Sequence, residues 1–170
     1  MLNRLITSKT RLKLLIKFFI SQANKGHLNG LATEMGESTN SIRKELNHLY
    51  DAGYLDKQKN NNKVVYNVNT KHPLYGTLRQ VVMKHLGLDE IVETVVNKMG
   101  GVKKIILVGD YARGFDSGRI EVFLLGNDLN TEYIEQLAPK IESVIDRQVS
   151  FYLASKFNTN QNHIILYENI

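Results

Sequence analysis

The segment Asn29–Gly53, NGLATEMGESTNSIRKELNHLYDAG, decides the fold that we expect for this chain. Ser38 is a suitable N-cap, because its hydroxyl can accept a hydrogen bond from an N–H of the first helical turn. The helix after it has an apolar stripe at spacings of four and three, formed by Ile42, Leu46 and Leu49. Gly36 suits a tight turn before this helix, because glycine readily adopts a positive φ. The segment therefore predicts a short helix, a turn and a longer helix.

The outward face of the longer helix is polar and basic. Its side chains are Asn40, Ser41, Arg43, Lys44, Asn47 and His48. Amide and basic groups near the start of such a second helix can enter the DNA major groove and bind base edges. A solvated surface helix is the alternative interpretation of the same pattern.

A first helix is expected from about Ser8 to Gln22. Leu12, Leu15, Ile16 and Phe19 lie on one face of it, and Lys13 and Lys17 are expected to point away. Apolar residues cover more than half of its circumference. Two interpretations remain open, a well-buried core helix and a helix that also meets a second subunit.

Two strands are expected after the longer helix, over Tyr54–Lys59 and Lys63–Asn69, with asparagines at 60–62 between them. Asparagine tolerates positive φ, which suits a hairpin tip. Lys57, Lys59 and Lys63 crowd this tip, where they can contact phosphates. A hairpin in this place is a wing.

Residues 8–69 resemble the winged-helix domain of ArsR-type bacterial repressors. The segment ESTNSIRKELNHLYDAGYL carries the resemblance, with an Ala-Gly-hydrophobic step leading from the recognition helix into the wing. The resemblance implies binding to double-stranded DNA. Many members of that family sense metals through cysteines, and this chain has none, so metal sensing is not implied.

Charge is distributed unevenly along the 170 residues, whose net charge is +5. Residues 1–75 hold 12 Lys/Arg and 5 Asp/Glu, whereas residues 76–170 hold 10 and 12. A basic half suggests a polyanionic partner. The absence of cysteine excludes disulfides and thiolate metal sites. No apolar run approaches the length of a membrane span and no signal peptide is recognised, so we expect a cytoplasmic protein that does not bind membranes.

A third helix is expected to start at Pro73, with a stripe of Leu74, Leu78, Val81, Val82 and His85. It can pack on the first helix, on a dimer mate or on a second domain. A domain boundary is expected after Gly87.

The second half reads as a small α/β domain with a mixed sheet. Helices are expected over Asp89–Met99 and Thr131–Asp146, and strands over Ile105–Val108, Ile120–Leu125, Val149–Leu153 and His163–Tyr167.

The segment ILVGDYARGFDSGRIEVFLL resembles the core of the minimal nucleotidyltransferase family. Gly109, Arg113 and Gly114 match the family pattern, in which an Asp-x-Asp pair on the next strand holds two Mg²⁺ ions. Asp110 replaces the family's serine, and Arg119-Ile120-Glu121 replaces the carboxylate pair. An arginine there would repel a divalent cation. Asp116 could replace the missing carboxylate only in part, because its position in a loop does not fix the metal geometry. We therefore expect a degenerate, inactive domain without catalytic residues, metal or cofactor. The alternative interpretation of this segment is a tight turn without a ligand site. Its glycines would then be structural, and Arg113 would pair with Asp110 or Glu121.

The sequence thus predicts an α+β protein of two domains, a winged helix-turn-helix over residues 1–87 and a nucleotidyltransferase-like α/β domain over residues 88–170. The expected function is that of a homodimeric transcriptional regulator, whose second domain serves sensing, dimerisation or regulation through an unknown small-molecule or nucleotide effector. The alternatives are a Mg²⁺-dependent nucleotidyltransferase and a protein–protein adaptor. The residues expected to contact DNA are Ser38, Thr39, Asn40, Ser41, Arg43, Lys44, His48, Lys59 and Lys63. The residues of the possible ligand site are Gly109, Asp110, Arg113, Gly114, Ser117, Arg119 and Glu121.

Overall fold

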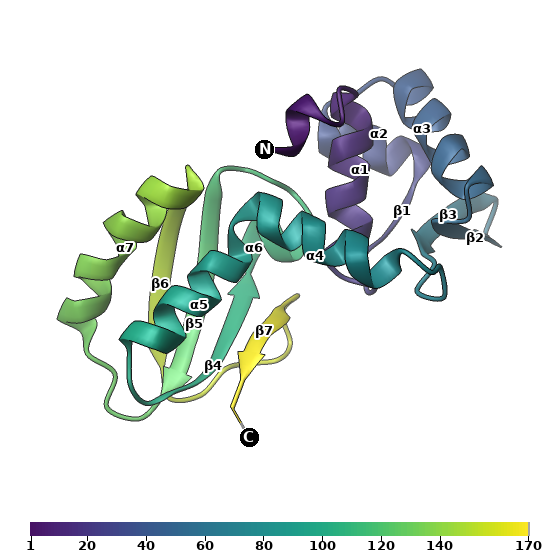
Figure 1. The fold of residues 1–170 in the computed structure, drawn as a ribbon. Coiled ribbons are helices and arrows are strands. Elements are labelled where there is room, and N and C mark those ends of the chain that lie inside the picture. The colour runs from purple at the N-terminus through teal and green to yellow at the C-terminus, as the bar shows by residue number, and fades with distance from the viewer. Residues whose placement is uncertain (170) are drawn as a thin grey trace. The chain divides into compact units, whose positions relative to one another are not determined.

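The computed structural model describes residues 1–169 and is a mixed α+β protein with two sheets among those residues (Figure 1). Its residues cluster into two compact units, Met1–His85 and a second unit from Leu86 onward. Among the described residues, no helix combines the length and the apolar character needed to cross a bilayer.

The first unit packs helices against a three-stranded antiparallel sheet of order β1-β3-β2. Its elements are η1 (Leu2–Arg4), α1 (Lys9–Phe19), β1 (Lys25–His27), α2 (Leu28–Met35), α3 (Thr39–Asp51), β2 (Leu55–Asn60), β3 (Lys63–Val68) and α4 (Tyr75–Leu86). The four α-helices and the two hairpin strands occur close to the predicted ranges, although α4 begins at Tyr75 and not at Pro73, and η1 was not predicted. Strand β1 was not predicted.

Helix α1 is the centre of the first unit's core. Leu14, Phe18, Phe19 and Ile20 are all fully buried, and the Phe19 ring lies 6.0 Å from that of Tyr75. The unit itself therefore uses the apolar surface that suggested a second subunit.

The prediction that Lys17 points away from the core is wrong. Its side chain is only 9% exposed, and its Nζ lies 2.7 Å from Glu34 Oε1 on α2. Lys13 likewise reaches back, to Glu37 Oε1 at 2.8 Å and to the Met35 carbonyl at 3.0 Å. Lys17 is thus buried against α2, whereas Lys13 makes its contacts with a side chain that is still 40% exposed.

The turn between α2 and α3 has the predicted chemistry. Gly36 ends α2 in the left-handed conformation with φ of 64°. Ser38 caps α3, because its Oγ accepts a hydrogen bond from the Ser41 N–H at 3.1 Å. The predicted stripe of α3, Ile42, Leu46 and Leu49, is buried.

Helix α4 is only partly buried in the way that was predicted. Val82 is buried, but Leu74 is 46% exposed and Val81 lies at the surface. The buried residues of α4 are Val82 and Leu86, and Leu78 and His85 are half-buried, so only part of the predicted inner face is correct.

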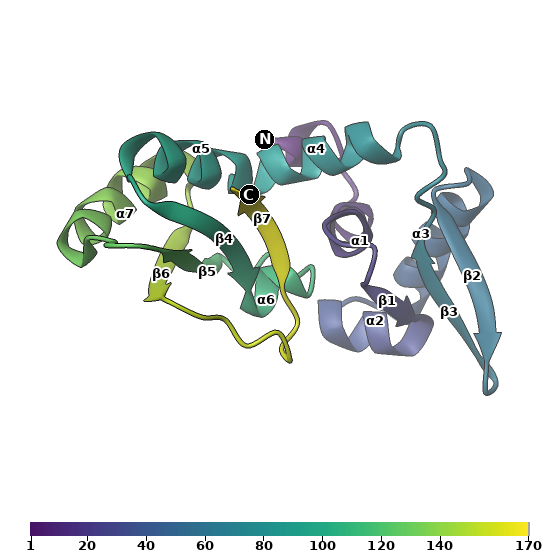
Figure 2. The same ribbon diagram turned by 90° about the horizontal axis from the view of Figure 1, so that it is seen from below.

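The second unit is a four-stranded mixed sheet of order β6-β5-β4-β7, in which only the β5–β6 pair is parallel. Both of its longer helices cover the same face of the sheet, as Figure 2 shows. The elements are α5 (Leu88–Lys98), β4 (Val102–Val108), α6 (Gly109–Ala112), β5 (Arg119–Gly126), α7 (Thr131–Ile145), β6 (Gln148–Ala154) and β7 (Ile164–Glu168). The predicted mixed sheet is therefore present.

The two faces of this sheet differ. Ile105, Leu107, Val122 and Leu124 are fully buried, and strand alternation places them on the face opposite to Ile106 and Val108. On the opposite face, Ile106, Val108 and Leu125 form a smaller cluster with Phe123 and Phe157. The segment after β6 crosses this second face and leaves part of it exposed.

Candidate nucleic-acid interface

Helix α3 has one buried face and one solvated face. Glu45, Leu46 and Leu49 are buried on the inner side. The outer side carries Asn40, Arg43, Lys44, Asn47 and His48, and all five are exposed. Of the residues predicted to reach DNA from this helix, Thr39, Asn40, Arg43, Lys44 and His48 are exposed, as is Asn47. Ser41 is half-buried, and its hydroxyl oxygen accepts a hydrogen bond from the Ser38 hydroxyl at 2.9 Å.

An ion pair between a buried carboxylate and a partly exposed arginine joins the helix to α1. Glu45 Oε2 accepts a hydrogen bond from Arg11 Nε at 2.7 Å, and Glu45 Oε1 accepts one from the Ser8 hydroxyl at 3.2 Å. The Glu45 side chain is 7% exposed, so its charge is satisfied inside the unit. These contacts hold the inner face of α3 against α1 and leave its outer face toward solvent.

The start of α3 attracts anions through its unsatisfied N–H groups. Thr39 and Asn40 are exposed there, whereas the Ser41 N–H is occupied by Ser38. Glu37 lies just before the cap, and its hydrogen bond from Lys13 lowers the pKa of the Glu37 carboxyl below its ordinary value. Lys13 therefore offsets the negative charge of Glu37 close to the helix start.

Arg43 and Asn40 form a preassembled pair on the outer face. Arg43 Nη1 donates a hydrogen bond to Asn40 Oδ1 at 2.9 Å. The pair restricts both side chains before any ligand binds, which lowers the entropic cost of binding. Both residues remain exposed.

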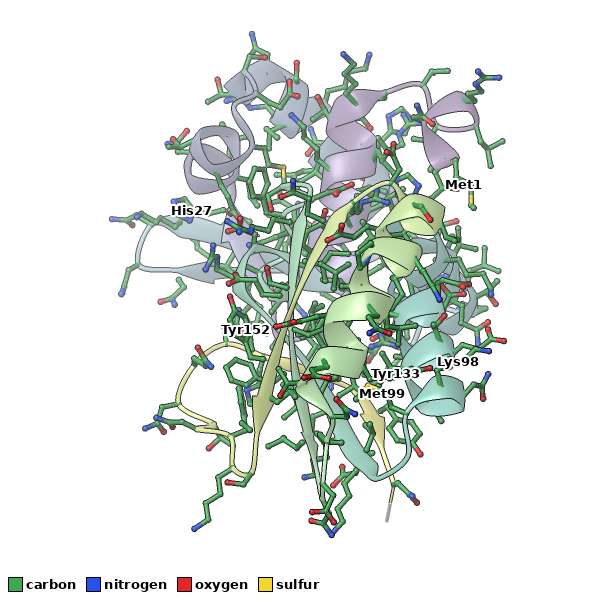
Figure 3. The ribbon with its side chains drawn as sticks, turned by 90° about the vertical axis from the view of Figure 1, so that its left-hand side faces the viewer. Met1, His27, Lys98, Met99, Tyr133 and Tyr152 are labelled. Atoms are coloured by element: carbon green, nitrogen blue, oxygen red, sulfur yellow. The ribbon has the colours of Figure 1, made fainter. Side chains whose placement is uncertain are left out.

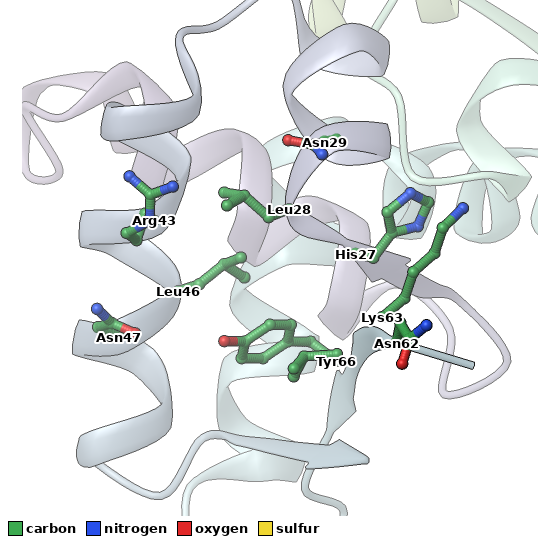
Figure 4. Close-up of a pocket in the computed structure, with 10 residues that line it drawn as sticks. His27, Leu28, Asn29, Arg43, Leu46, Asn47, Asn62, Lys63 and Tyr66 are labelled. Carbon is green, nitrogen blue, oxygen red and sulfur yellow. The ribbon is translucent and has the colours of Figure 1, made fainter. Parts of the chain in front are cut away.

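A groove of about 360 Å³ runs between α3 and the strands (Figure 4). Its lining is rich in amide and basic groups: His27, Leu28, Asn29, Arg43, Leu46, Asn47, Asn62, Lys63, Val64 and Tyr66. The sequence did not point to His27 or Asn29, because their place depends on β1. Three residues without alternation give no strand signal.

The hairpin lysines do not form one cluster. Lys59 lies opposite Val64 and Lys63 lies opposite Asn60, so they project from opposite faces of the hairpin. Both are exposed. Lys57 instead places its Nζ 4.0 Å from the centre of the Tyr50 ring, a cation–π contact with the end of α3.

In the second unit, the turn after β4 brings Gly109 against Glu121. Gly109 has φ of 70°, and a Cβ there would lie 2.1 Å from Glu121 Oε2. Arg113 pairs with Asp110, one of the partners foreseen for it. Arg119 is exposed, and Glu121 Oε1 accepts a hydrogen bond from the Tyr152 hydroxyl at 3.2 Å. Gly114, buried, and Ser117, exposed, complete the predicted set.

Asp116 is held in a structural network. Arg147 donates to both of its oxygens, at 2.9 and 2.8 Å, and the Tyr111 hydroxyl also bonds to it. Burial of the phenol, together with this carboxylate, raises the pKa of Tyr111, and Asp116 raises the pKa of Arg147. Across residues 1–169, no three His, Asp or Glu side chains gather in a way that could hold a metal ion.

No family model and no curated protein matches the chain. The solved structures that resemble part of it include the following two. A chain from a mutant of the toxin–antitoxin pair MntA-HpeT is 21% identical with a TM-score of 0.43, and the match covers 48% of this chain and 72% of that one. Sso10a-2, a DNA-binding protein from Sulfolobus solfataricus, is 16% identical with a TM-score of 0.36, and the match covers 51% and 88%. What this chain does must therefore be inferred from its own residues.

Proposed function

We propose that this protein is a sequence-specific DNA-binding transcriptional regulator of the ArsR-like winged-helix type, acting in the cytoplasm. The observation that carries the proposal is the outer face of α3, where five amide, basic and imidazole side chains are exposed above a buried anchor. A helix of this kind fits the major groove of B-DNA. The β2–β3 hairpin then acts as the wing.

In this proposal, the protein binds DNA through phosphate contacts and through base contacts. Thr39 and Asn40 offer N–H groups to a phosphate at the start of α3, and Lys59 and Lys63 bind flanking phosphates. Asn40, Arg43 and Lys44 contact base edges, with Asn47 and His48 further along the groove. Phosphate contacts set orientation, and base contacts set sequence preference.

Two substitutions on α3 test the assignment. Genomic fragments bound by the wild type would first be selected, and affinities for the best site then measured for Asn40→Ala and Lys44→Ala. We expect Asn40→Ala to cost about 1–3 kcal/mol and to relax the preference at one base pair. We expect Lys44→Ala to weaken binding as well, because it removes an exposed cation from the same face.

The matched control is Lys156→Ala, which removes one exposed lysine from the second unit. It should leave the affinity unchanged. Full binding by both α3 variants would refute the role of this helix. If no duplex is bound even at low salt, the adaptor function becomes the better explanation.

We also propose that the regulator is a homodimer and that its second unit serves dimerisation or effector binding instead of nucleotidyl transfer. In support, Arg119 and Glu121 occupy the positions of the expected carboxylate pair, and Asp116 is committed to Arg147. A cation-bearing site of this kind would not hold two Mg²⁺ ions.

Incubation with Mg²⁺ and radiolabelled nucleoside triphosphates tests this second proposal. We expect no transfer of label to the protein, to RNA or to added small molecules. Glu121→Gln serves as the matched control, because it removes the remaining carboxylate at little change in size. Labelled product that disappears in Glu121→Gln would show the second unit to be an enzyme.

A further inference from the structure

Strand β6 forms an edge of the sheet in the second unit. Its register with β5 runs without a shift from Arg119↔Gln148 to Leu125↔Ala154, and no described strand lies beyond it. Figure 3 views the molecule from this side, with Tyr152 lying across β6 from α7. One long side of β6 is therefore open.

Two neighbouring hydrogen bonds show which backbone groups face outward. The Gln148 N–H donates to the Gly118 carbonyl at 2.9 Å, toward β5. The Val149 N–H instead donates to Glu142 Oε1 on α7 at 2.9 Å, away from β5. Because these directions alternate along a strand, the N–H and C=O groups of Phe151 and Leu153 also point away from β5.

Nothing in the sequence of β6 discourages another strand from pairing there. Natural proteins protect open edges with charged residues, proline or bulges. The strand QVSFYLA has none of these. The opposite edge, β7, is protected by a register shift against β4 and by Glu168.

We propose that β6 pairs antiparallel with β6 of a second copy of this chain, joining two four-stranded sheets into one. With the two-fold axis at Tyr152, Phe151 of each copy faces Leu153 of the other, and each such pair exchanges two hydrogen bonds. An uncharged strand is compatible with its own copy, whereas a charged one would repel itself. Glu142, already bonded to Val149, marks one end of the paired segment.

The axis also places the two Tyr152 side chains directly opposite one another. The Tyr152 residue is 42% exposed, and its ring packs on Phe123 with centroids 5.1 Å apart. Aromatic pairs at such positions stabilise antiparallel strands. This arrangement supplies a surface for the proposed homodimer, and it does not depend on DNA binding.

Charge substitution at the axis tests the pairing, using the full chain without DNA. Sedimentation equilibrium across the micromolar range should show a dimer for the wild type and for Tyr152→Phe. Tyr152→Lys and Tyr152→Glu should each weaken self-association on the order of tenfold or more, because like charges then face each other in place of the aromatic pair. An equimolar mixture of the two charged variants should recover a heterodimer.

Val144→Lys is the matched control, because Val144 is an apolar residue of α7 that is 66% exposed and lies outside the edge. It should leave self-association unchanged. Hydrogen exchange on the wild type gives a second readout that requires no variant. The Phe151 and Leu153 amides should exchange more slowly as protein concentration rises. A monomeric wild type, association unaffected by Tyr152→Lys, or concentration-independent exchange of these two amides would each overturn the proposal.

Discussion

At the scale of single residues, Tyr111 holds together the loop between α6 and β5. Its hydroxyl bonds to the Asp116 carboxylate and accepts a hydrogen bond from the Gly118 N–H at 2.9 Å. Arg147 in turn binds both oxygens of Asp116 from just before β6. The ring of Tyr111 is fully buried. One phenol therefore ties the turn after β4 to the start of β6.

This phenol makes stability depend on pH in the alkaline range. Burial and the Asp116 carboxylate raise the pKa of Tyr111 above its ordinary value near 10. Above that pH the unfolded chain releases the proton while the folded protein retains it, so the stabilisation present below pH 10 is lost as pH rises toward the folded pKa. Tyr111→Phe should lower the free energy of unfolding at pH 7 by about 1–3 kcal/mol, because the Gly118 N–H and Asp116 lose a partner.

Urea unfolding at pH 7 and at several values above pH 9 measures both effects. The difference between wild type and Tyr111→Phe is the relevant quantity, because other tyrosines and lysines also titrate there. We expect this difference to shrink as pH rises. A constant difference would mean that Tyr111 does not titrate differently in the folded state.

At the scale of elements, the β2–β3 hairpin depends on two asparagines. Asn61 and Asn62 have φ of 48° and 67°. Two-residue hairpin turns with positive φ at both central positions match the twist of the strands. Asn62→Gly should therefore keep or slightly raise stability, whereas Asn62→Val should lower it by roughly 1–2 kcal/mol, because a β-branched residue is strained there.

Thermal unfolding of the two variants, each compared with wild type, checks this prediction. Gln58→Val is a suitable control, because it introduces the same side chain at an exposed strand position of the same hairpin. A loss of stability in Gln58→Val as large as in Asn62→Val would show that turn geometry is not the cause.

The elements of the first unit show which parts of the fold could be predicted from the sequence. The helix-turn-helix and the hairpin were predicted because their signals are local: a cap at Ser38, a glycine turn and alternation along β3. Strand β1 was missed because it exists only through its pairing with β3. The groove residue His27 was missed for the same reason.

The orientation of Lys17 was predicted wrongly for a different physical reason. Helical periodicity places a residue on a face, but it does not reveal an acidic partner 17 residues away. The pairing of Asp116 with Arg147 is equally nonlocal, since it joins groups 31 residues apart. Ion pairs between different elements are therefore the feature of the candidate sites that could not be predicted from the sequence.

At the scale of the whole molecule, ion pairs determine which basic side chains remain without an acidic neighbour in the first unit. Three acidic side chains of the first unit, Glu34, Glu37 and Glu45, pair with cations of α1. The exposed cations of α3 and the hairpin, Arg43, Lys44, Lys59 and Lys63, are consequently not offset by these acids. In the proposed complex, these exposed cations supply the positive charge that meets the DNA phosphates.

The salt dependence of DNA binding should report the contribution of these cations. Each lysine bound to a phosphate releases condensed counterions, so removing one such lysine changes the slope of log K against log salt by about 0.9 on B-DNA. Lys59→Ala and Lys63→Ala should each reduce the slope by roughly one per bound chain and weaken all sequences alike, because both lysines bind the DNA backbone in the proposed complex. Their double variant should reduce it by about two, because the lysines lie on opposite faces of the hairpin and bind different phosphates. Lys156→Ala should leave the slope unchanged, whereas an equal reduction in that variant would mean that binding reflects total charge and not the placement of α3 and its wing.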